Sequence, residues 1–140
     1  TGKPAAARQL PDGRIVTGKT TNLLGAVSAL LLNALKALGE IPDEMHLISP
    51  QAIDPIQHLK VEHLANRNPR LHTDETLVAL AISAATDPNA ERAMDALSDL
   101  KRCEAHSTVI LTEIDAGIFR KLGMNLTCDP EYQTKKLFHN

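Results

Sequence analysis

The sequence is poor in aromatic side chains. Among 140 residues there are only Phe119, Tyr132 and Phe138, and there is no tryptophan. The core must therefore be built from Leu, Ile, Val and Ala. Proteins that bind single strands of nucleic acid stack bases on aromatic faces, so the shortage of such faces argues against that class of function.

A basic surface is also missing. The net charge is -2, and both signs are mixed along the chain. Proteins that bind duplexes neutralise phosphates with clustered Lys and Arg. We therefore predict no nucleic-acid partner.

Cysteines and long apolar runs are scarce. Cys103 and Cys128 are the only cysteines and have no CxxC spacing, which favours a reduced, intracellular setting over a disulfide framework. No signal-peptide pattern opens the chain. The longest apolar stretch, LLGAVSALLLNAL, is interrupted by Gly25, Ser28 and Asn33 and falls short of the roughly 20 residues that span a bilayer. We predict a cytoplasmic protein without a membrane partner.

The chain starts at Thr1 with the segment TGKPAAARQLPD. We interpret residues 1–12 as a linker or the tail of a preceding domain, and residues 13–140 as a single α/β domain from the C-terminal part of a longer protein. The alternative is the removal of an initiator Met, which a following Thr permits. A chain of this length can build one domain with a real core.

Strands and helices alternate in the predicted structure. Runs rich in β-branched or apolar residues predict strands at 14–17, 45–49, 107–112 and 124–128. Helical spacing and capping signals predict helices at about 21–38, 55–64, 73–84, 88–100 and 116–123. This order favours an α/β layered fold with helices over a largely parallel or mixed sheet of about four strands.

Three predicted strand-to-helix turns look alike. IVTGKTTNLL, LISPQAIDPI and ILTEIDAGIF each run from an apolar strand into a hydroxyl residue, Thr17, Ser49 or Thr112, and then into a helix. In a parallel sheet these residues gather at the carboxyl edge, where open α/β sheets bind ligands. Alternatively, Ser and Thr are simply good turn and cap residues.

The stretch GRIVTGKT spells the phosphate-loop pattern G-x-x-x-x-G-K-T. A predicted strand lies inside it and separates Gly13 from Gly18 by roughly 15 Å, at about 3.3 Å per residue. Two glycines so far apart cannot hold one phosphate, so we predict no nucleotide-binding phosphate loop. Lys19, Thr20 and Thr21 still follow a strand and precede a predicted helix, which favours either a general anion site or an ordinary turn.

The six histidines do not form a recognisable metal motif. His58 and His63 are five residues apart and would diverge by about 140° on an α-helix, unlike the four-residue spacing of zinc peptidases. Cys103 and His106 have a zinc-ligand spacing but no second pair. We predict no metal and no cofactor.

His72 precedes Asp74 and Glu75, a cluster that suits either acid/base chemistry or a helix cap. The predicted ligand set therefore has three parts. Lys19, Thr20 and Thr21 would hold an anion, Ser49 and Thr112 would add hydroxyl contacts, and His72 or His106 would act as acid or base. The sequence specifies no reaction.

A resemblance covers nearly the whole chain from Leu10 onward. The blocks QLPDGRIVTGKTTNLLGA, LLLNALKAL, LISPQAIDPIQHLK, NPRLHTDE, CEAHSTVIL, FRKLGMNLTCDP and YQTKKL resemble, in order, the C-terminal part of the bacterial domain-of-unknown-function family 1846. The family resemblance implies a larger cytoplasmic protein, an N-terminal partner domain with its own glycine-rich segment, and a three-layer α/β/α sandwich similar in topology to the deaminase fold.

The family has no established activity, so the resemblance carries over no catalytic residue. The deaminase signature H-x-E with P-C-x-x-C is absent from the sequence, and a shared fold does not imply a shared function. We expect the domain to bind an anionic small molecule together with the N-terminal domain. The alternative is an interaction module without a ligand, whose apolar helix Leu23–Leu38 packs on that domain or on a second copy in a homo-oligomer.

Overall fold

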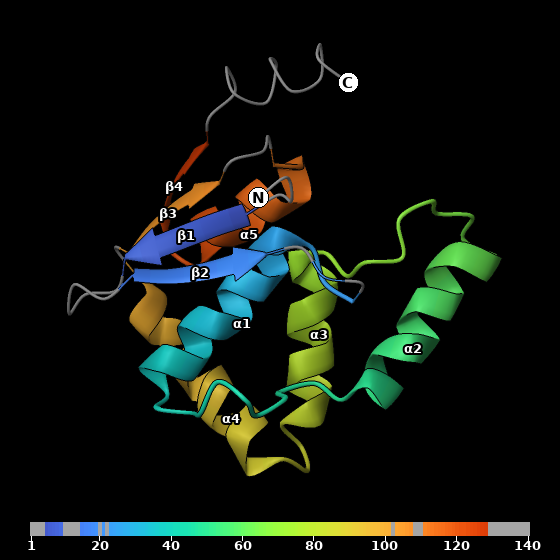
Figure 1. Cartoon of the computed structure of the whole chain (residues 1–140), viewed down its shortest axis with the longest axis horizontal. Helices are drawn as coiled ribbons and strands as arrows, with labels where there is room; N and C mark the ends of the chain where they lie inside the picture. The colour runs from blue at the N-terminus through green and yellow to red at the C-terminus, as the bar shows by residue number, and fades with distance from the viewer. Residues whose placement is uncertain are drawn as a thin grey trace.

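The computed structural model describes residues 5–9, 15–19, 21, 23–101, 103–107 and 111–128. Its sheet consists of β1 (Ala5–Gln9), β2 (Ile15–Lys19), β3 (Glu104–Ser107) and β4 (Asn125–Cys128), in the order β2-β1-β3-β4. β1 is antiparallel to both of its neighbours, and β3 is parallel to β4. Consequently β2, β3 and β4 share one direction (Figure 1).

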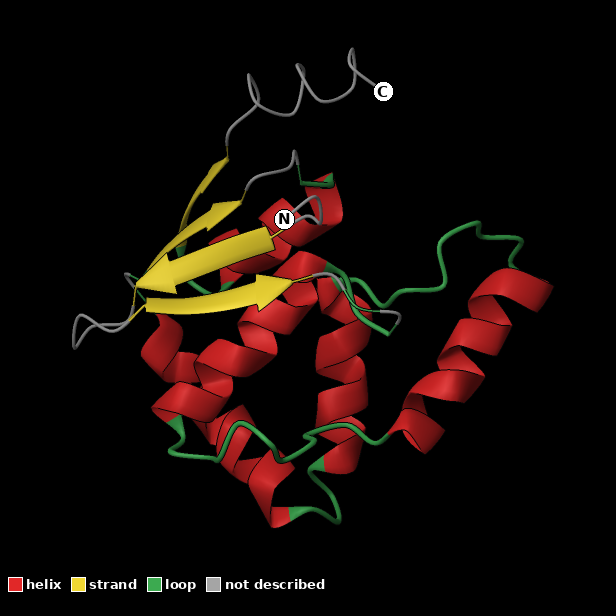
Figure 2. Ribbon diagram, viewed as in Figure 1, coloured by secondary structure: helices red, strands yellow, loops and turns green. Residues whose placement is uncertain are grey.

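Helices make up most of the described chain (Figure 2). They are α1 (Ala26–Leu38), α2 (Pro50–His58), the π-helical η1 (Leu59–His63), α3 (Thr73–Ser83), α4 (Pro88–Asp95), the 3-10 segment η2 (Ala96–Leu100) and α5 (Glu113–Lys121). Among these, none combines the length and the apolar character that a membrane crossing requires.

The predicted three-layer α/β/α sandwich is wrong, because the helices lie on one face of the sheet (Figure 2). Ala105 points inward and is 3% exposed. Its neighbours Glu104 and His106 on β3, and Thr127 on β4, are exposed on the other face. The chain is mostly helical, with a small sheet on one side instead of a sheet at its centre.

The physical reason lies in α1. Nine of its thirteen residues are buried, including Leu30, Leu31 and Leu35. A helix that is apolar on nearly all sides must be covered on nearly all sides. One side of α1 packs on β1 and β2, and the other packs on α3, α4 and η2. The helices that the sandwich would have placed across the sheet therefore form a second helical layer over α1.

Two predicted elements change type. Residues 45–49 are not a strand but a loop that ends at Ser49, the N-cap of α2, because Pro50 lacks an N–H and starts a helix instead. Ala5–Gln9, which we expected in a linker, form β1 between two partner strands. Alanines have a low β propensity, and only pairing on both sides makes this segment a strand.

The strand predicted at 124–128 is confirmed by β4. The one predicted at 107–112 starts earlier, as β3, and residues 108–110 lie outside the described part. The helix predicted from Thr21 begins only at Ala26, with Gly25 at its N-cap. The delay arises because the Thr21 hydroxyl accepts hydrogen bonds from the N–H groups of Leu23 and Leu24 in a turn.

Candidate functional site

A cavity of about 390 Å³ lies beside α1, between β2 and the loop that leads to α2. Its walls are mainly apolar, with a few polar groups that converge on the space. The apolar residues are Leu23, Leu24, Ala29, Leu32, Leu47, Ile48 and Ile53, and the polar ones are Thr17, Thr21, Asn33, Lys36 and His46. Concave, mostly apolar sites with a few placed polar groups are typical of small-molecule binding.

Lys36 is the one lysine or arginine in the described lining of this cavity. Its Nζ donates a hydrogen bond to the backbone oxygen of Asp43, 3.0 Å away. An ammonium group has three N–H donors, so this contact uses only part of its capacity. Burial lowers the pKa of Lys36, and the nearby carboxylates of Asp43 and Glu44 offset the effect only in part. A bound anion would favour the charged form of Lys36, which burial disfavours.

Asn33 links two elements of the cavity wall by a hydrogen bond. It lies three residues before Lys36 on α1, about one helical turn away, so both side chains project from the same side of the helix. Its Nδ2 donates to the backbone oxygen of Thr17, 2.9 Å away. This bond ties α1 to β2 at the edge of the sheet. The site thus rests on two adjoining elements and not on a loop alone.

Of the predicted anion ligands, Thr21 lines the cavity. Lys19 is the last residue of β2, and neither its side chain nor Thr20 belongs to the described part. Gly18 and Lys19 lie within the strand, and α1 starts well after Thr21. The expected helix N-terminus directly behind Gly18 to Thr21 is therefore wrong.

Ser49 and Thr112 both act as helix caps. The Ser49 hydroxyl accepts from Ala52 N at 3.2 Å, next to Ile48 of the cavity wall. The Thr112 hydroxyl accepts from Asp115 N at 3.1 Å and caps α5. Neither residue is among those that line the cavity. The expected gathering of three hydroxyl turns around one ligand is not seen.

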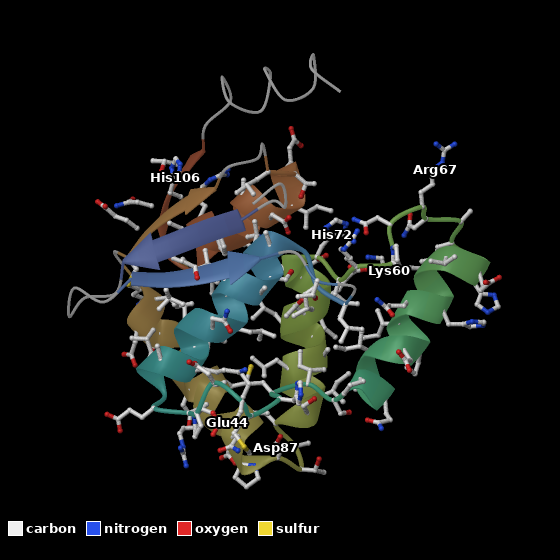
Figure 3. All side chains as sticks on the ribbon, viewed as in Figure 1. Glu44, Lys60, Arg67, His72, Asp87 and His106 are labelled. Carbon is white, nitrogen blue, oxygen red and sulfur yellow. The ribbon has the colours of Figure 1, made fainter. Side chains whose placement is uncertain are left out.

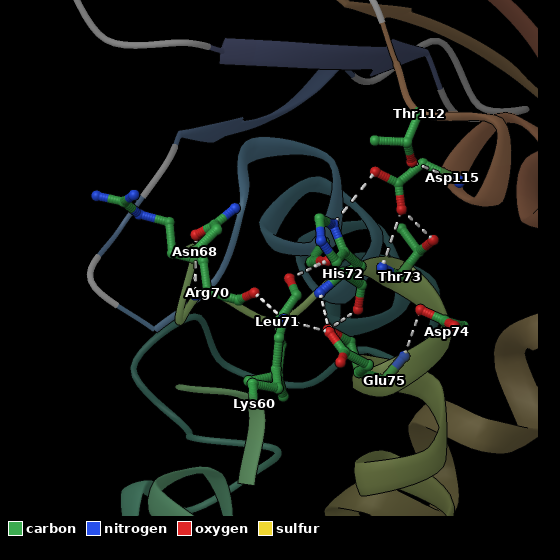
Figure 4. Close-up of polar contacts among 12 residues, drawn as sticks. Lys60, Asn68, Arg70, Leu71, His72, Thr73, Asp74, Glu75, Thr112 and Asp115 are labelled. Atoms are coloured by element: carbon green, nitrogen blue, oxygen red, sulfur yellow. Dashed lines mark hydrogen bonds and ion pairs between the residues drawn. The ribbon is translucent and has the colours of Figure 1, made fainter. Parts of the chain in front are cut away.

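A separate polar cluster joins the N-termini of α3 and α5 (Figure 4). Oδ1 of the buried Asp115 accepts from the Thr73 hydroxyl at 2.6 Å and from the Thr73 N–H at 3.1 Å. The second oxygen, Oδ2, lies 4.0 Å from His72 Nδ1, too far for a hydrogen bond. Asp115 lies in the first turn of α5, where a negative charge interacts favourably with the helix dipole. Both this position and the hydrogen bonds from Thr73 indicate a structural role for Asp115.

Lys60 extends this cluster, and sequence reasoning missed it. Its side chain is 3% exposed, and its Nζ donates to Glu75 Oε1 at 2.7 Å and to the backbone oxygen of Arg70 at 2.6 Å. Glu75 Oε1 also accepts from His72 N at 2.9 Å, which confirms the helix-cap interpretation of this segment. Lys60 lies in the π-helical segment η1, and no local pattern in the sequence predicts either this π-turn or the burial of Lys60.

His106 lies elsewhere, on the outer face of the sheet, with Nδ1 2.9 Å from the Thr127 hydroxyl. Figure 3 shows it far from His72 and Lys60. The predicted ligand residues therefore do not share one site. Thr21 lines the cavity, His72 and Thr112 lie at the cluster of α3 and α5, and His106 lies on the outer sheet face.

His58 and His63 are brought together, against expectation. The hydrogen bond from Leu64 N to Leu59 O closes a π-turn, which needs five residues where an α-turn needs four. Residues five apart then lie on one face, and the two ring centroids are 5.2 Å apart. The predicted divergence of about 140° is wrong because it assumed α-helical geometry. Within the described ranges there is still no group of three or more metal-ligating side chains.

Comparison with known proteins agrees with the sequence blocks. The family model "Domain of unknown function DUF1846, C-terminal" matches residues 1–138. The chain is 57% identical over 138 residues to a UPF0371 protein of Corynebacterium efficiens, covering 99% of this chain and 28% of that protein. It is 56% identical over 138 residues to a UPF0371 protein of Streptococcus pyogenes serotype M5, again covering 99% and 28%.

The chain thus spans about 28% of the length of these curated relatives. Both the ordered sequence blocks and the match over residues 1–138 point to one conclusion. The chain belongs to the DUF1846 family, of which it represents the C-terminal domain.

Proposed function

We propose that this domain binds a small anionic molecule in the cavity beside α1, as one part of a longer cytoplasmic protein whose N-terminal region completes the site. The observation that carries the proposal is Lys36, a partly desolvated cation that faces a cavity with no carboxylate in its described lining. Lys19 and Thr20, which precede Thr21, are proposed as further ligands.

The surroundings of Lys36 support binding of charge by the cavity. Desolvation disfavours the charged form of a lysine, and an opposite charge close by favours it. Asp43 and Glu44 raise the pKa of Lys36, yet burial has the larger effect. An anion in the cavity would therefore gain a strong partner, with Asn33 and Thr21 as neutral neighbours.

The proposal is tested by thermal-shift measurements on the full-length protein with phosphate, pyrophosphate and acetate. We expect a concentration-dependent rise in Tm with at least one of these anions, because a ligand that binds only the folded state stabilises it. Lys36→Met should abolish the rise. The matched control is Lys121→Met, which removes an exposed lysine on α5, outside the cavity lining.

Two results would reject the proposal. The first is the absence of a shift with these three anions and with the longer carboxylate octanoate, up to millimolar concentrations. The second is an equal shift in wild type and Lys36→Met, since binding would then occur elsewhere.

A second candidate function is a docking surface for the remainder of the longer protein. The outer side of α3 is apolar, with Val78 60% and Ile82 70% exposed, and Leu64 beyond η1 is 60% exposed. Large apolar residues grouped on one helix face mark interaction sites more often than isolated ones. The occupant would be the N-terminal region, since relatives extend far beyond the matched part. The helix that we expected to dock, α1, is buried and unavailable.

Cysteine labelling of the full-length protein tests this second candidate. If the N-terminal region covers α3, Ile82→Cys should react with a maleimide much more slowly than Glu91→Cys, an exposed position on α4. Denaturant should remove the difference. Equal rates in the native protein would mean that α3 faces solvent and would exclude the docking surface.

A further inference from the structure

The described lining of the cavity beside α1 combines a single lysine with mostly apolar side chains. Lys36 supplies the only lysine or arginine charge of its described lining, whereas six Leu and Ile side chains supply most of the rest. These six residues are Leu23, Leu24, Leu32, Leu47, Ile48 and Ile53. An arrangement of this kind matches a molecule that has a single charged head and an apolar remainder.

The electrostatic surroundings argue against a polyanion. An adjoining groove shares Thr17, Asn33 and Lys36 with the cavity and is also lined by Glu40 and Asp43. Glu44 adds a further negative charge close to Lys36. A triphosphate would meet one ammonium group and three carboxylates, and like charges at short range repel. A single anionic group can pair with Lys36 and stay clear of the acidic groove.

The backbone also lacks what a triphosphate needs. Nucleotide sites wrap phosphates with successive free N–H groups of a glycine-rich loop. Here Gly18 lies within β2 and pairs with Ala6 of β1. The N–H groups of Leu23 and Leu24 donate to the Thr21 hydroxyl. Hydrogen bonds within the chain thus occupy donors that a phosphate would require.

The apolar wall of the cavity consists of buried core side chains and of two half-buried leucines. Leu47, Ile48 and Ile53 are each at most 4% exposed and belong to the core. Leu23 and Leu24 are half-buried and pack against that core. An apolar group of a ligand would bury the exposed parts of Leu23 and Leu24 together with its own surface, and burial of apolar surface is favourable in proportion to its area.

We infer that the ligand of this cavity is an amphipathic monoanion, a carboxylate on an apolar chain, with its head at Lys36 and its body along Leu23, Leu24 and Leu32. This inference rests on the proposed anion site and narrows its substrate class. It excludes nucleotides and other polyanions as the preferred ligands.

Isothermal titration of the full-length protein tests this inference with four probes: octanoate, 1-octanol, inorganic phosphate and ATP. Octanoate should bind saturably, at least tenfold more tightly than either 1-octanol or phosphate, because it alone offers both the charge and the apolar body. ATP should bind more weakly than octanoate. Lys36→Met should reduce the affinity for octanoate to that for 1-octanol, and Lys121→Met should leave it unchanged.

A second variant separates the two halves of the cavity. Leu23→Ala removes part of the apolar wall without touching Lys36, and Leu23 is only half-buried, so the fold should persist. We expect weaker binding of octanoate and unchanged binding of phosphate. Circular dichroism of both variants confirms that they are folded.

The results distinguish the inferred amphipathic ligand from the more general proposal of an anion site at Lys36. Phosphate or ATP binding that depends on Lys36 and equals or exceeds octanoate binding would overturn the amphipathic ligand and leave the anion site in place. Octanoate binding that is unaffected by Lys36→Met would also overturn it. If no anion binds at all, both the inference and the proposed function are wrong.

Discussion

Gly18→Ala is the substitution for which the structure makes the sharpest prediction. Gly18 lies in β2 where α1 crosses the sheet, and a Cβ at this position would collide with Leu30 N and lie 2.6 Å from Leu30 Cα. The backbone oxygen of Ala26 would be 2.8 Å away. Ordinary carbon contacts are about 3.5–4.0 Å. One methyl group would therefore push the middle of α1 away from the sheet.

The size of the effect follows from which atoms collide. Overpacking typically costs about 1–3 kcal/mol when side chains can rearrange. Here the colliding atoms belong to the backbone of a buried helix, whose hydrogen bonds resist displacement. We therefore expect a loss of about 3 kcal/mol or more in the free energy of unfolding. At about 4 °C per kcal/mol for a domain of this size, Tm should fall by about 12 °C.

Urea denaturation of the 140-residue chain, followed by circular dichroism, measures this loss. Gly117→Ala is the matched control, because Gly117 lies inside α5 and a Cβ there meets no atom within 4 Å. Alanine should stabilise that helix by about 0.5–1 kcal/mol. If Gly18→Ala changed the free energy of unfolding by less than about 0.5 kcal/mol, α1 could not lie as close to β2 as described.

Two further predictions concern polar groups. Thr73→Val removes the hydroxyl that donates to the buried Asp115 carboxylate at 2.6 Å and should lower the free energy of unfolding by about 1–3 kcal/mol. The control Thr86→Val, at an exposed position after α3, should change the free energy of unfolding little. Equal effects of the two substitutions in urea denaturation would contradict this role of Thr73. Lys36 has a lowered pKa in the folded state, so the unfolded chain binds more protons between that pKa and the ordinary value of 10.5. Stability should therefore contain a component that rises with pH across this alkaline window and vanishes in Lys36→Met, while a pH profile identical in wild type and variant would refute the desolvation of Lys36.

Much of the helical structure follows from local sequence signals. Asp87 caps α4 before Pro88, and Gly39 closes α1, as the sequence predicts. These signals act within one or two turns, so neighbouring residues suffice to reveal them. The strand inside GRIVTGKT is likewise confirmed by β2, because a β-branched pair between turn residues is a local pattern too.

The candidate site was much less predictable. The sequence points to Thr17 and Thr21 of the cavity lining but not to Asn33, Lys36 and His46, because these three come from α1 and a distant loop. Read alone, Lys36 belongs to a narrow polar stripe on an apolar helix. The cavity forms only because the loop at 42–48 lies opposite this stripe and supplies His46, Leu47 and Ile48 to the lining. Similarly, Lys60 of the π-helical segment Leu59–His63 contacts Glu75, which is 15 residues away in the sequence, and local spacing could not indicate this contact.

Sequence alone determined the family, the poverty in aromatic residues and the strand inside GRIVTGKT. Each of these is a property of residue identity and spacing along the chain. Tertiary structure decided the rest: the pairing of β1 between β2 and β3, the burial of α1 between sheet and helices, and the cavity at Lys36. The physical reason is that strand pairing and burial depend on partners far away in sequence, which residue spacing does not specify.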